Sequence, residues 1–104
     1  MKIGNKHIGK NHSPFIIAEM SGNHNQSIEN ALSIVRHAAS SGVNALKIQT
    51  YTPKTITLDS TQDDFYIKDK NSIWNGLRLY DLYEKAHTPW EWHKEIFLFQ
   101  YFFY

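Results

Sequence analysis

The chain has 104 residues, of which 41% are hydrophobic, 20% charged and 14% aromatic, and its formal net charge is +1. This length fits one domain at most, and the apolar fraction with the low net charge excludes a disordered tail. The 11 basic and 10 acidic residues leave no strong positive field, so we expect no nucleic-acid and no membrane partner. Cysteine is absent, which excludes disulfides and thiol nucleophiles and is typical of a cytoplasmic protein.

The first predicted element is a strand. Pro14 precedes residues 15–18, which are β-branched, aromatic or small and predict a buried strand that ends near Glu19 or Met20. Residues 1–10 lack the apolar core of a signal peptide, so none is expected. The polar stretch that follows the strand contains a glycine and predicts a loop.

A helix and a second strand follow this loop. Ser27 is positioned as the N-cap, and Gly42 stands where a glycine commonly ends a helix. The apolar residues between them recur at spacings of three and four: Ile28, Ala31, Leu32, Val35, Ala38 and Ala39. A short strand is predicted over residues 45–49. The order strand, helix, strand predicts a βαβ unit with parallel strands, and therefore an α/β fold class.

The rest of the chain is more polar and less regular. Residues 50–70 predict a long connection rich in Thr, Asp and Lys, and residues 79–85 predict a short helix. The stretch Thr88-Pro89-Trp90-Glu91 matches a capping box with proline at the first helical position, which predicts a helix that runs through Ile96.

Residues 97–104 depart from the pattern of an outer helix because they present no polar face. Six of the chain's 15 aromatic residues lie in this stretch. One explanation is a buried C-terminal helix. The other, which we favour, is an aberrant tail produced when a chain is cut short or read out of frame.

Ionisable and polar side chains lie at the ends of both predicted strands. Since side chains alternate along a strand, Glu19 lies on one face of the first strand, while Lys47 and Gln49 share a face of the second. In open α/β sheets and in (β/α)₈ barrels, ligands bind at the carboxyl ends of the strands. A lysine among apolar strand residues needs an anionic partner, because it has to give up part of its hydration.

Two interpretations of Lys47 remain open at this point. Its anion could be a substrate phosphate or carboxylate, with Glu19 serving general acid–base chemistry or holding a substrate hydroxyl. Alternatively, Lys47 and Glu19 form a purely structural ion pair, or Lys47 lies in water on an edge strand. Asn23, His24 and Asn25 form a dense hydrogen-bonding cluster in the adjacent loop, from which a ligand is within reach.

The other candidates point to packing. The lone His24 has no neighbours at metal-ligand spacing. His87 and His93 are six residues apart, which does not place two ligands on one helix face, so surface or packing roles are expected. The three tryptophans are more typical of a core than of sugar stacking. There is no glycine-rich phosphate loop and no nucleophile elbow.

The motif Ala-Glu-Met-Ser-Gly-Asn-His-Asn-Gln-Ser at residues 18–27 resembles the sialic acid synthase family. That family's pattern is Ala-Glu-(Ile/Met)-x-x-Asn-His, followed by a helix and then by a Lys-x-Gln strand, which is Lys47-Ile48-Gln49 here. The Met-Ser-Gly-Asn-His-Asn-Gln variant is similar to the branch of the family that makes pseudaminic acid. Further stretches similar to that branch are residues 46–52, 55–59, 79–83 and 88–93.

The resemblance implies a fold and a reaction. The fold is the N-terminal part of a TIM-type (β/α)₈ barrel, incomplete because a full barrel needs about 250 residues. Residues 1–104 would be this partial barrel, with 97–104 as the aberrant tail. In the reaction, carbon 3 of phosphoenolpyruvate attacks the aldehyde of 2,4-diacetamido-2,4,6-trideoxy-altrose, water adds at carbon 2, and phosphate leaves.

The resemblance also implies roles for residues and partners. Glu19 would lie at the reacting centre and Lys47 would hold the phosphoenolpyruvate anion. Among the other substrate-binding residues, Gln49 would hydrogen-bond the sugar, Asn23 would shape the site, and Asn75 would be a further sugar contact. A divalent metal, Mn²⁺ or Mg²⁺, would polarise the aldehyde, with its ligands beyond this chain. The whole protein would be a homodimer, and the present chain an inactive fragment. The alternatives are an N-acetylneuraminate or legionaminate synthase, and a non-catalytic α/β interaction module.

Overall fold

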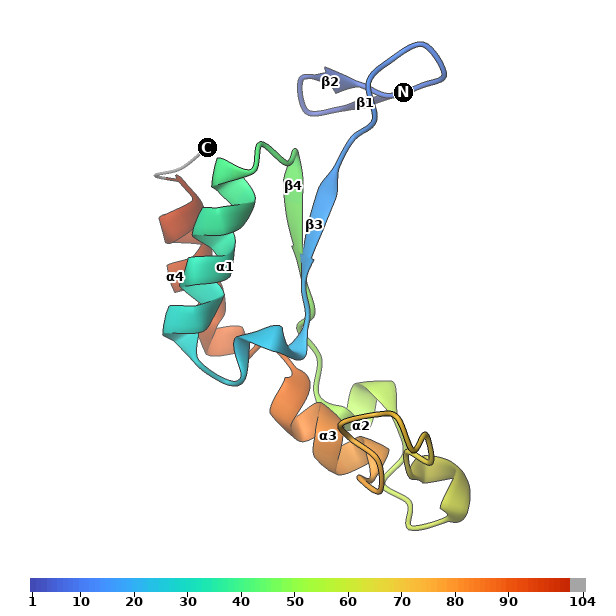
Figure 1. The fold of residues 1–104 in the computed structure, drawn as a ribbon. Coiled ribbons are helices and arrows are strands. Elements are labelled where there is room, and N and C mark those ends of the chain that lie inside the picture. Colours follow the sequence, from blue (N-terminus) through green and yellow to red (C-terminus); the bar gives the residue numbers. More distant parts are fainter. Residues whose placement is uncertain (102–104) are drawn as a thin grey trace.

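The computed structural model describes residues 1–101 as a mixed α/β arrangement with extents of 47 × 33 × 25 Å (Figure 1). Its strands are β1 (Lys2–Ile3), β2 (Lys6–His7), β3 (Ile17–Met20) and β4 (Ala45–Ile48). Its helices are α1 (Ile28–Ser40), α2 (Pro53–Ile56), α3 (Leu79–Ala86) and α4 (His93–Tyr101), with short 3-10 turns at Gly22–His24, Asp63–Phe65 and Trp90–Trp92. In the described part of the chain, no helix is long and apolar enough to cross a membrane.

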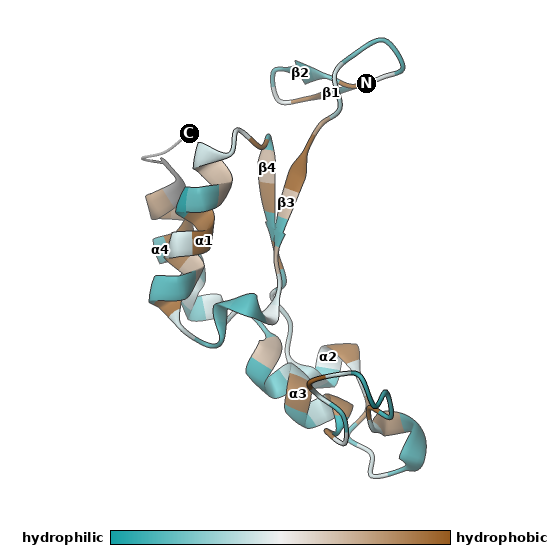
Figure 2. Ribbon diagram, viewed as in Figure 1, coloured by the Kyte–Doolittle hydropathy of each residue, from teal (hydrophilic) through white to brown (hydrophobic). Residues whose placement is uncertain are grey.

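The predicted βαβ unit is confirmed by β3, α1 and β4. The two strands pair in parallel, with Ile17 opposite Ala45 and Met20 opposite Ile48. Upstream of the sheet, the Ile16 amide donates to the Asn44 side chain at 2.8 Å, which fixes where the strands meet. Both strands are apolar except at the third position, which is Glu19 on β3 and Lys47 on β4, and Figure 2 shows this as a hydrophilic band across the sheet.

The predicted ends of α1 are also confirmed. The Ser27 hydroxyl accepts a hydrogen bond from the Asn30 amide at 3.2 Å, as an N-cap does. At the other end Gly42 has φ +74°, a left-handed conformation that glycine adopts without the steric cost of a side chain. These local signals therefore fix the length of the crossover helix.

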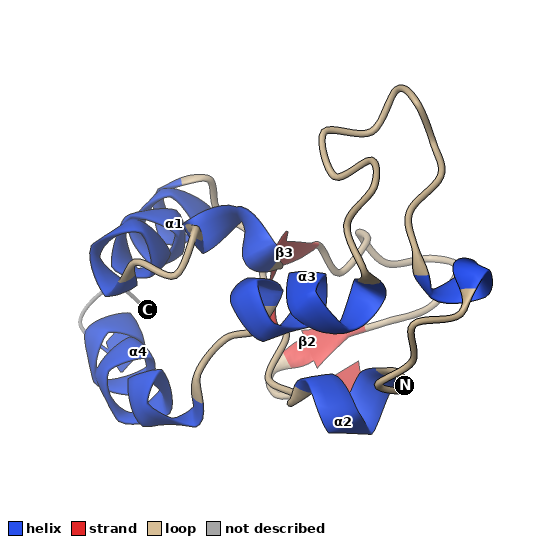
Figure 3. Ribbon diagram, turned by 90° about the horizontal axis from the view of Figure 1, so that it is seen from below, coloured by secondary structure: helices blue, strands red, loops and turns tan. Residues whose placement is uncertain are grey.

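The core lies where α1, α4 and one face of the β3–β4 sheet meet. Met20, Ala31, Val35 and Ile96 are almost completely buried there. Partly buried apolar residues surround this cluster, namely Ile28, Leu32, Ile34, Leu46, Ile48, Trp92 and Phe99. Figure 3 shows α1 and α4 as neighbours, with α3 beside that pair and α2 beyond α3.

The prediction of a fully buried first strand is wrong for Ile17, whose side chain is 56% exposed. Ile17 lies on the sheet face opposite Met20, the face that is turned away from α1. Among the described residues, helical cover therefore buries only one face of this sheet.

Two further elements are absent from the sequence-based prediction. The prediction that Pro14 opens the first structured element is wrong, because β1 and β2 form an antiparallel hairpin with Gly4 at φ +54° in its turn. The connection after β4 contains the four-residue helix α2, in which the Thr52 amide donates to the Thr55 hydroxyl at 3.1 Å. Elements this short show no detectable periodicity.

The predicted capping box at Thr88 is wrong. Thr88 is fully buried, its amide donates to the Gln49 carbonyl at 2.9 Å, and its hydroxyl lies 3.4 Å from His24 Nε2. Pro89 instead precedes the 3-10 turn, and α4 begins only at His93. Because Thr88 is buried with its hydroxyl facing His24, that hydroxyl is not available to cap a helix.

The predicted aberrant tail overlaps the second half of α4. Within it Phe99 packs against the core and lies under the guanidinium of Arg36, at 5.5 Å from ring centre to carbon. Phe97 and Leu98 are more than half exposed. Residues 102–104 lie outside the described residues, so the interpretation of 97–104 stays a prediction.

Candidate functional site

The strand register brings together three of the residues predicted from the sequence. Glu19 on β3 is the direct partner of Lys47 on β4, and Lys47 Nζ lies 2.7 Å from Glu19 Oε2. The other carboxylate oxygen accepts a short hydrogen bond from the Gln49 amide. All three side chains therefore meet on the sheet face turned away from α1, at the carboxyl ends of parallel strands.

The charges of Glu19 and Lys47 stabilise each other, and both side chains remain partly open to solvent. The hydrogen bond from Lys47 lowers the pKa of Glu19, and the bond from Gln49 adds to that effect. Glu19 is therefore ionised at neutral pH. The side chains of Lys47 and Glu19 are 56% and 46% exposed. Part of the Lys47 ammonium is therefore accessible to a phosphate or carboxylate from solvent.

A cavity of about 610 Å³ adjoins this cluster. Of the predicted site residues, Asn23 and Gln49 line it, and Gln49 links it to Glu19. Glu19 and Lys47 are not among its lining residues, and neither is Asn75, which is exposed in the turn beside the lining residue Trp74. The remaining lining is apolar and aromatic with a few polar groups: Ser21, Gly22, Asn25, Tyr51, Ile73, Leu77, Asp81, Leu82, Tyr83, Lys85 and Ala86.

One wall of the cavity is the loop between β3 and α1, which is built around a buried histidine. His24 is fully buried, and its Nδ1 accepts a hydrogen bond from the Gln26 amide at 3.1 Å. The ring proton is therefore on Nε2, which faces the Thr88 hydroxyl. Burial, assisted by the nearby His87, lowers the pKa of His24, so the ring is neutral at pH 7.

The same loop is attached to the end of α3. The Gln26 side-chain amide donates to the Lys85 carbonyl at 2.9 Å and to the His87 carbonyl at 2.7 Å. Gly22 lies so close to Ala86 that a Cβ on it would come within 3.0 Å of the alanine Cβ. Sequence analysis missed the role of Gln26, because no spacing or periodicity connects residue 26 with residues some sixty positions later.

Of the other histidines and tryptophans that were singled out in the sequence, the histidines are partly buried, whereas two of the tryptophans are exposed. His87 and His93 are partly buried and hydrogen-bonded, to the Tyr83 carbonyl and the Thr50 hydroxyl respectively, as expected of packing histidines. The expectation of core packing is wrong for Trp74 and Trp90, which are exposed. Trp74 is instead part of the cavity wall.

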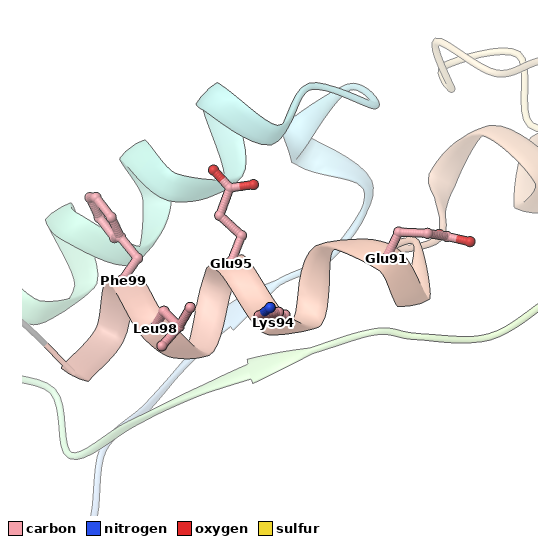
Figure 4. Close-up of a pocket in the computed structure, with 5 residues that line it drawn as sticks. All are labelled: Glu91, Lys94, Glu95, Leu98 and Phe99. Carbon is pink, nitrogen blue, oxygen red and sulfur yellow. The ribbon is translucent and has the colours of Figure 1, made fainter.

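The described residues do not form a metal centre. Among residues 1–101 no group of three histidine, cysteine, aspartate or glutamate side chains is placed to hold a metal ion. A second hollow, of about 450 Å³, lies along the 3-10 turn and α4 and is lined by Glu91, Lys94, Glu95, Leu98 and Phe99 (Figure 4). It contains none of the strand-end residues, so it is separate from the candidate site.

Comparisons with known proteins identify the family. The NeuB family model matches residues 34–101, from within α1 to the end of α4. Over 97 residues the chain is 50% identical to the pseudaminic acid synthase of Campylobacter jejuni, covering 93% of this chain and 27% of that protein. It is 45% identical over 84 residues to the pseudaminic acid synthase of Helicobacter pylori, covering 81% of this chain and 24% of that protein.

A more distant relative is the spore coat polysaccharide biosynthesis protein SpsE of Bacillus subtilis, 30% identical over 95 residues, which are 88% of this chain and 23% of that protein. The chain thus spans about a quarter of the length of the curated relatives it matches. The resemblance seen in residues 18–27 and in the Lys-x-Gln strand is confirmed. The chain belongs to the NeuB family.

Proposed function

We propose that this chain forms the first part of a (β/α)₈ barrel in a nonulosonate synthase of the pseudaminic acid type. The reaction joins carbon 3 of phosphoenolpyruvate to the aldehyde carbon of 2,4-diacetamido-2,4,6-trideoxy-altrose and releases phosphate. The observation that carries the proposal is the cluster of Glu19, Lys47 and Gln49 at the carboxyl ends of two parallel strands, the end at which barrel enzymes bind their ligands.

Each residue of the cluster has a role in this proposal. Lys47 holds the phosphoenolpyruvate anion, which takes over part of the negative charge that Glu19 now supplies. Glu19, kept ionised by its neighbours, lies at the reacting centre, beside the sugar and the water that adds at carbon 2. Gln49 and Asn23, which line the cavity, hydrogen-bond the sugar, and Asn75 is a further sugar contact from the adjoining turn.

The proposal extends to the whole protein. A divalent metal, Mn²⁺ or Mg²⁺, belongs to it, but the described residues do not fit such a site, so its ligands come from elsewhere and none of the roles above depends on it. The whole protein acts in the cytoplasm as a homodimer. Because the chain spans about a quarter of its relatives, we expect the 104 residues alone to release no phosphate from phosphoenolpyruvate.

The test uses a grafted enzyme. In it, the matched segment of the Campylobacter jejuni protein is replaced by the corresponding 97 residues of this chain. We expect it to release phosphate from phosphoenolpyruvate with the diacetamido-altrose and Mn²⁺, with the parent Campylobacter protein as the positive control. Preference for N-acetylmannosamine would point to the N-acetylneuraminate branch instead. A folded but inactive graft would contradict the proposal.

A further inference from the structure

The loop between β3 and α1 has a strained backbone. Asn25 and Gln26 have φ values of +50° and +57°, a left-handed region that side-chain-bearing residues rarely adopt and that two neighbours adopt less often still. Such strain persists only where surrounding contacts fix it, and it collects at functional sites. The contacts that hold this loop are therefore informative.

Both the backbone and the side chain of Gln26 take part in those contacts. Its backbone amide donates to the buried ring of His24 at 3.1 Å. Its side-chain amide gives one hydrogen to the Lys85 carbonyl and the other to the His87 carbonyl. These carbonyls belong to the end of α3, where the helix leaves its last C=O groups without partners of its own. Gln26 therefore acts as a remote C-cap for α3.

This cap joins two walls of the same cavity. Asn23 and Asn25, on either side of the buried His24, line it from the loop, while Tyr83 and Lys85 line it from α3. The side-chain oxygen Oδ1 of Asn23 already accepts a hydrogen bond from the Ser21 backbone amide at 3.1 Å, which leaves the side-chain NH₂ group as the end available to a ligand. Without the cap, the loop would keep the packing of Gly22 on Ala86 but would lose the two hydrogen bonds that orient it on the end of α3.

We propose that Gln26 is a positioning residue for the sugar side of the candidate site. It fixes the loop amides of Asn23 and Asn25 against α3 so that they can hydrogen-bond an amino-sugar aldose. This inference rests on the proposed function. Lys47 is held independently, by the strand register and its ion pair with Glu19, so the phosphoenolpyruvate side of the site does not depend on Gln26.

The test is steady-state kinetics of the grafted enzyme with Gln26→Leu, which keeps the side-chain length and removes both donors. We expect KM for the aldose to rise about tenfold, because small displacements of substrate-positioning groups are costly, while KM for phosphoenolpyruvate stays within about twofold. Gln62→Leu is the matched control, since Gln62 is exposed, precedes the 3-10 turn at Asp63–Phe65 and is not among the residues that line the cavity. It should leave both constants unchanged.

A second pair of variants separates positioning from folding. Gln26→Gly removes the side-chain donors and also relieves the left-handed strain, so it should fold where backbone strain prevents Gln26→Leu from folding, and it should raise the same KM. In Gln26→Glu the carboxylate faces two carbonyl oxygens and can donate to neither, so at about pH 8 this variant should raise KM for the aldose at least as much as Gln26→Leu.

The possible outcomes separate failure of the proposed function from failure of the role assigned to Gln26. If the unmodified graft makes no product, the proposed function fails and the inference fails with it. If the graft is active but Gln26→Leu and Gln26→Gly bind the aldose normally, only the inference is overturned. A parallel rise in KM for phosphoenolpyruvate would also overturn it, because it would indicate general disruption of the site.

Discussion

Glu19 and Lys47 are direct partners in the parallel register of β3 and β4, and their charged groups lie 2.7 Å apart. The pair is about half exposed, and exposed ion pairs contribute little to the stability of a fold. Its position at the ends of two parallel strands, with Gln49 on the same carboxylate, therefore suits ligand binding better than structural support.

The first prediction concerns Lys47. In the grafted enzyme, Lys47→Met should reduce kcat/KM for phosphoenolpyruvate by about 10- to 150-fold, since a charge-assisted bond to the substrate anion is lost. The urea midpoint of unfolding should change little. The measurements are phosphate release at varied phosphoenolpyruvate and unfolding followed by circular dichroism.

The matched control is Lys54→Met on the exposed surface of α2, which should keep the activity of the graft. If Lys47→Met retained normal use of phosphoenolpyruvate, the pair with Glu19 would be structural, as the alternative interpretation holds. A small non-catalytic interaction module would then be the better description of the chain.

The second prediction is a pH dependence of stability that originates in His24. Because burial lowers the pKa of this ring in the folded state, the unfolded chain binds more protons than the folded chain once the pH falls below about 6.5. Stability should therefore be complete above that pH and should decline as the pH falls from about 7 toward 5. Urea midpoints measured across this range would show the decline.

Substituting His24 should remove this part of the pH dependence. The chain with His24→Gln is expected to have a flatter profile between about pH 7 and 5, while His12→Gln, an exposed control, should leave the profile unchanged. Equal slopes in the two variants would show that the buried ring is not the group responsible.

The third prediction tests the close approach of the loop to α3. Gly22→Ala places a Cβ at 3.0 Å from the Ala86 Cβ and 3.3 Å from the Ala86 backbone, which is too close for carbon atoms. We expect a loss of about 1–3 kcal/mol in the free energy of unfolding, as for overpacking in general. Gly9→Ala is the control, because its nearest neighbour is 3.6 Å away. Equal stability of both variants would mean that the loop is free to move away from α3.

The fourth prediction distinguishes the two sides of α4. Ile96 is 2% exposed and belongs to the core cluster, so Ile96→Ala should cost about 2–5 kcal/mol. Leu98, two positions later, is 56% exposed, and Leu98→Ala should change the stability by no more than about 0.5 kcal/mol. Similar losses in both variants, measured by urea unfolding, would contradict the packing of α4 against α1.

The local signals in the sequence predicted the βαβ unit because each signal acts over a few residues. Ser27 caps its own helix, and strand alternation places Lys47 and Gln49 on one face wherever the strand lies. The approach of Glu19 to Lys47 then followed from parallel pairing of neighbouring strands. This part of the candidate site needed no knowledge of distant contacts.

The rest of the site depends on contacts between residues far apart in the chain. The bonds from Gln26 to the end of α3 and the contact of His24 with Thr88 span about sixty residues, and no sequence pattern marks them. At Thr88 the local capping signal was misleading, because burying the threonine beside His24 left its hydroxyl unavailable for capping. The cavity itself results from these long-range contacts.

The pairing of β3 with β4 limits how homologous chains can differ in length. Inserting or deleting one residue within either strand would turn Glu19 or Lys47 toward α1 and place a charge among the residues around Met20. Gaps in alignments of related proteins should therefore be rare in these strands. They should collect in the irregular segment between α2 and α3 and in the N-terminal hairpin, where no such alternation has to be preserved.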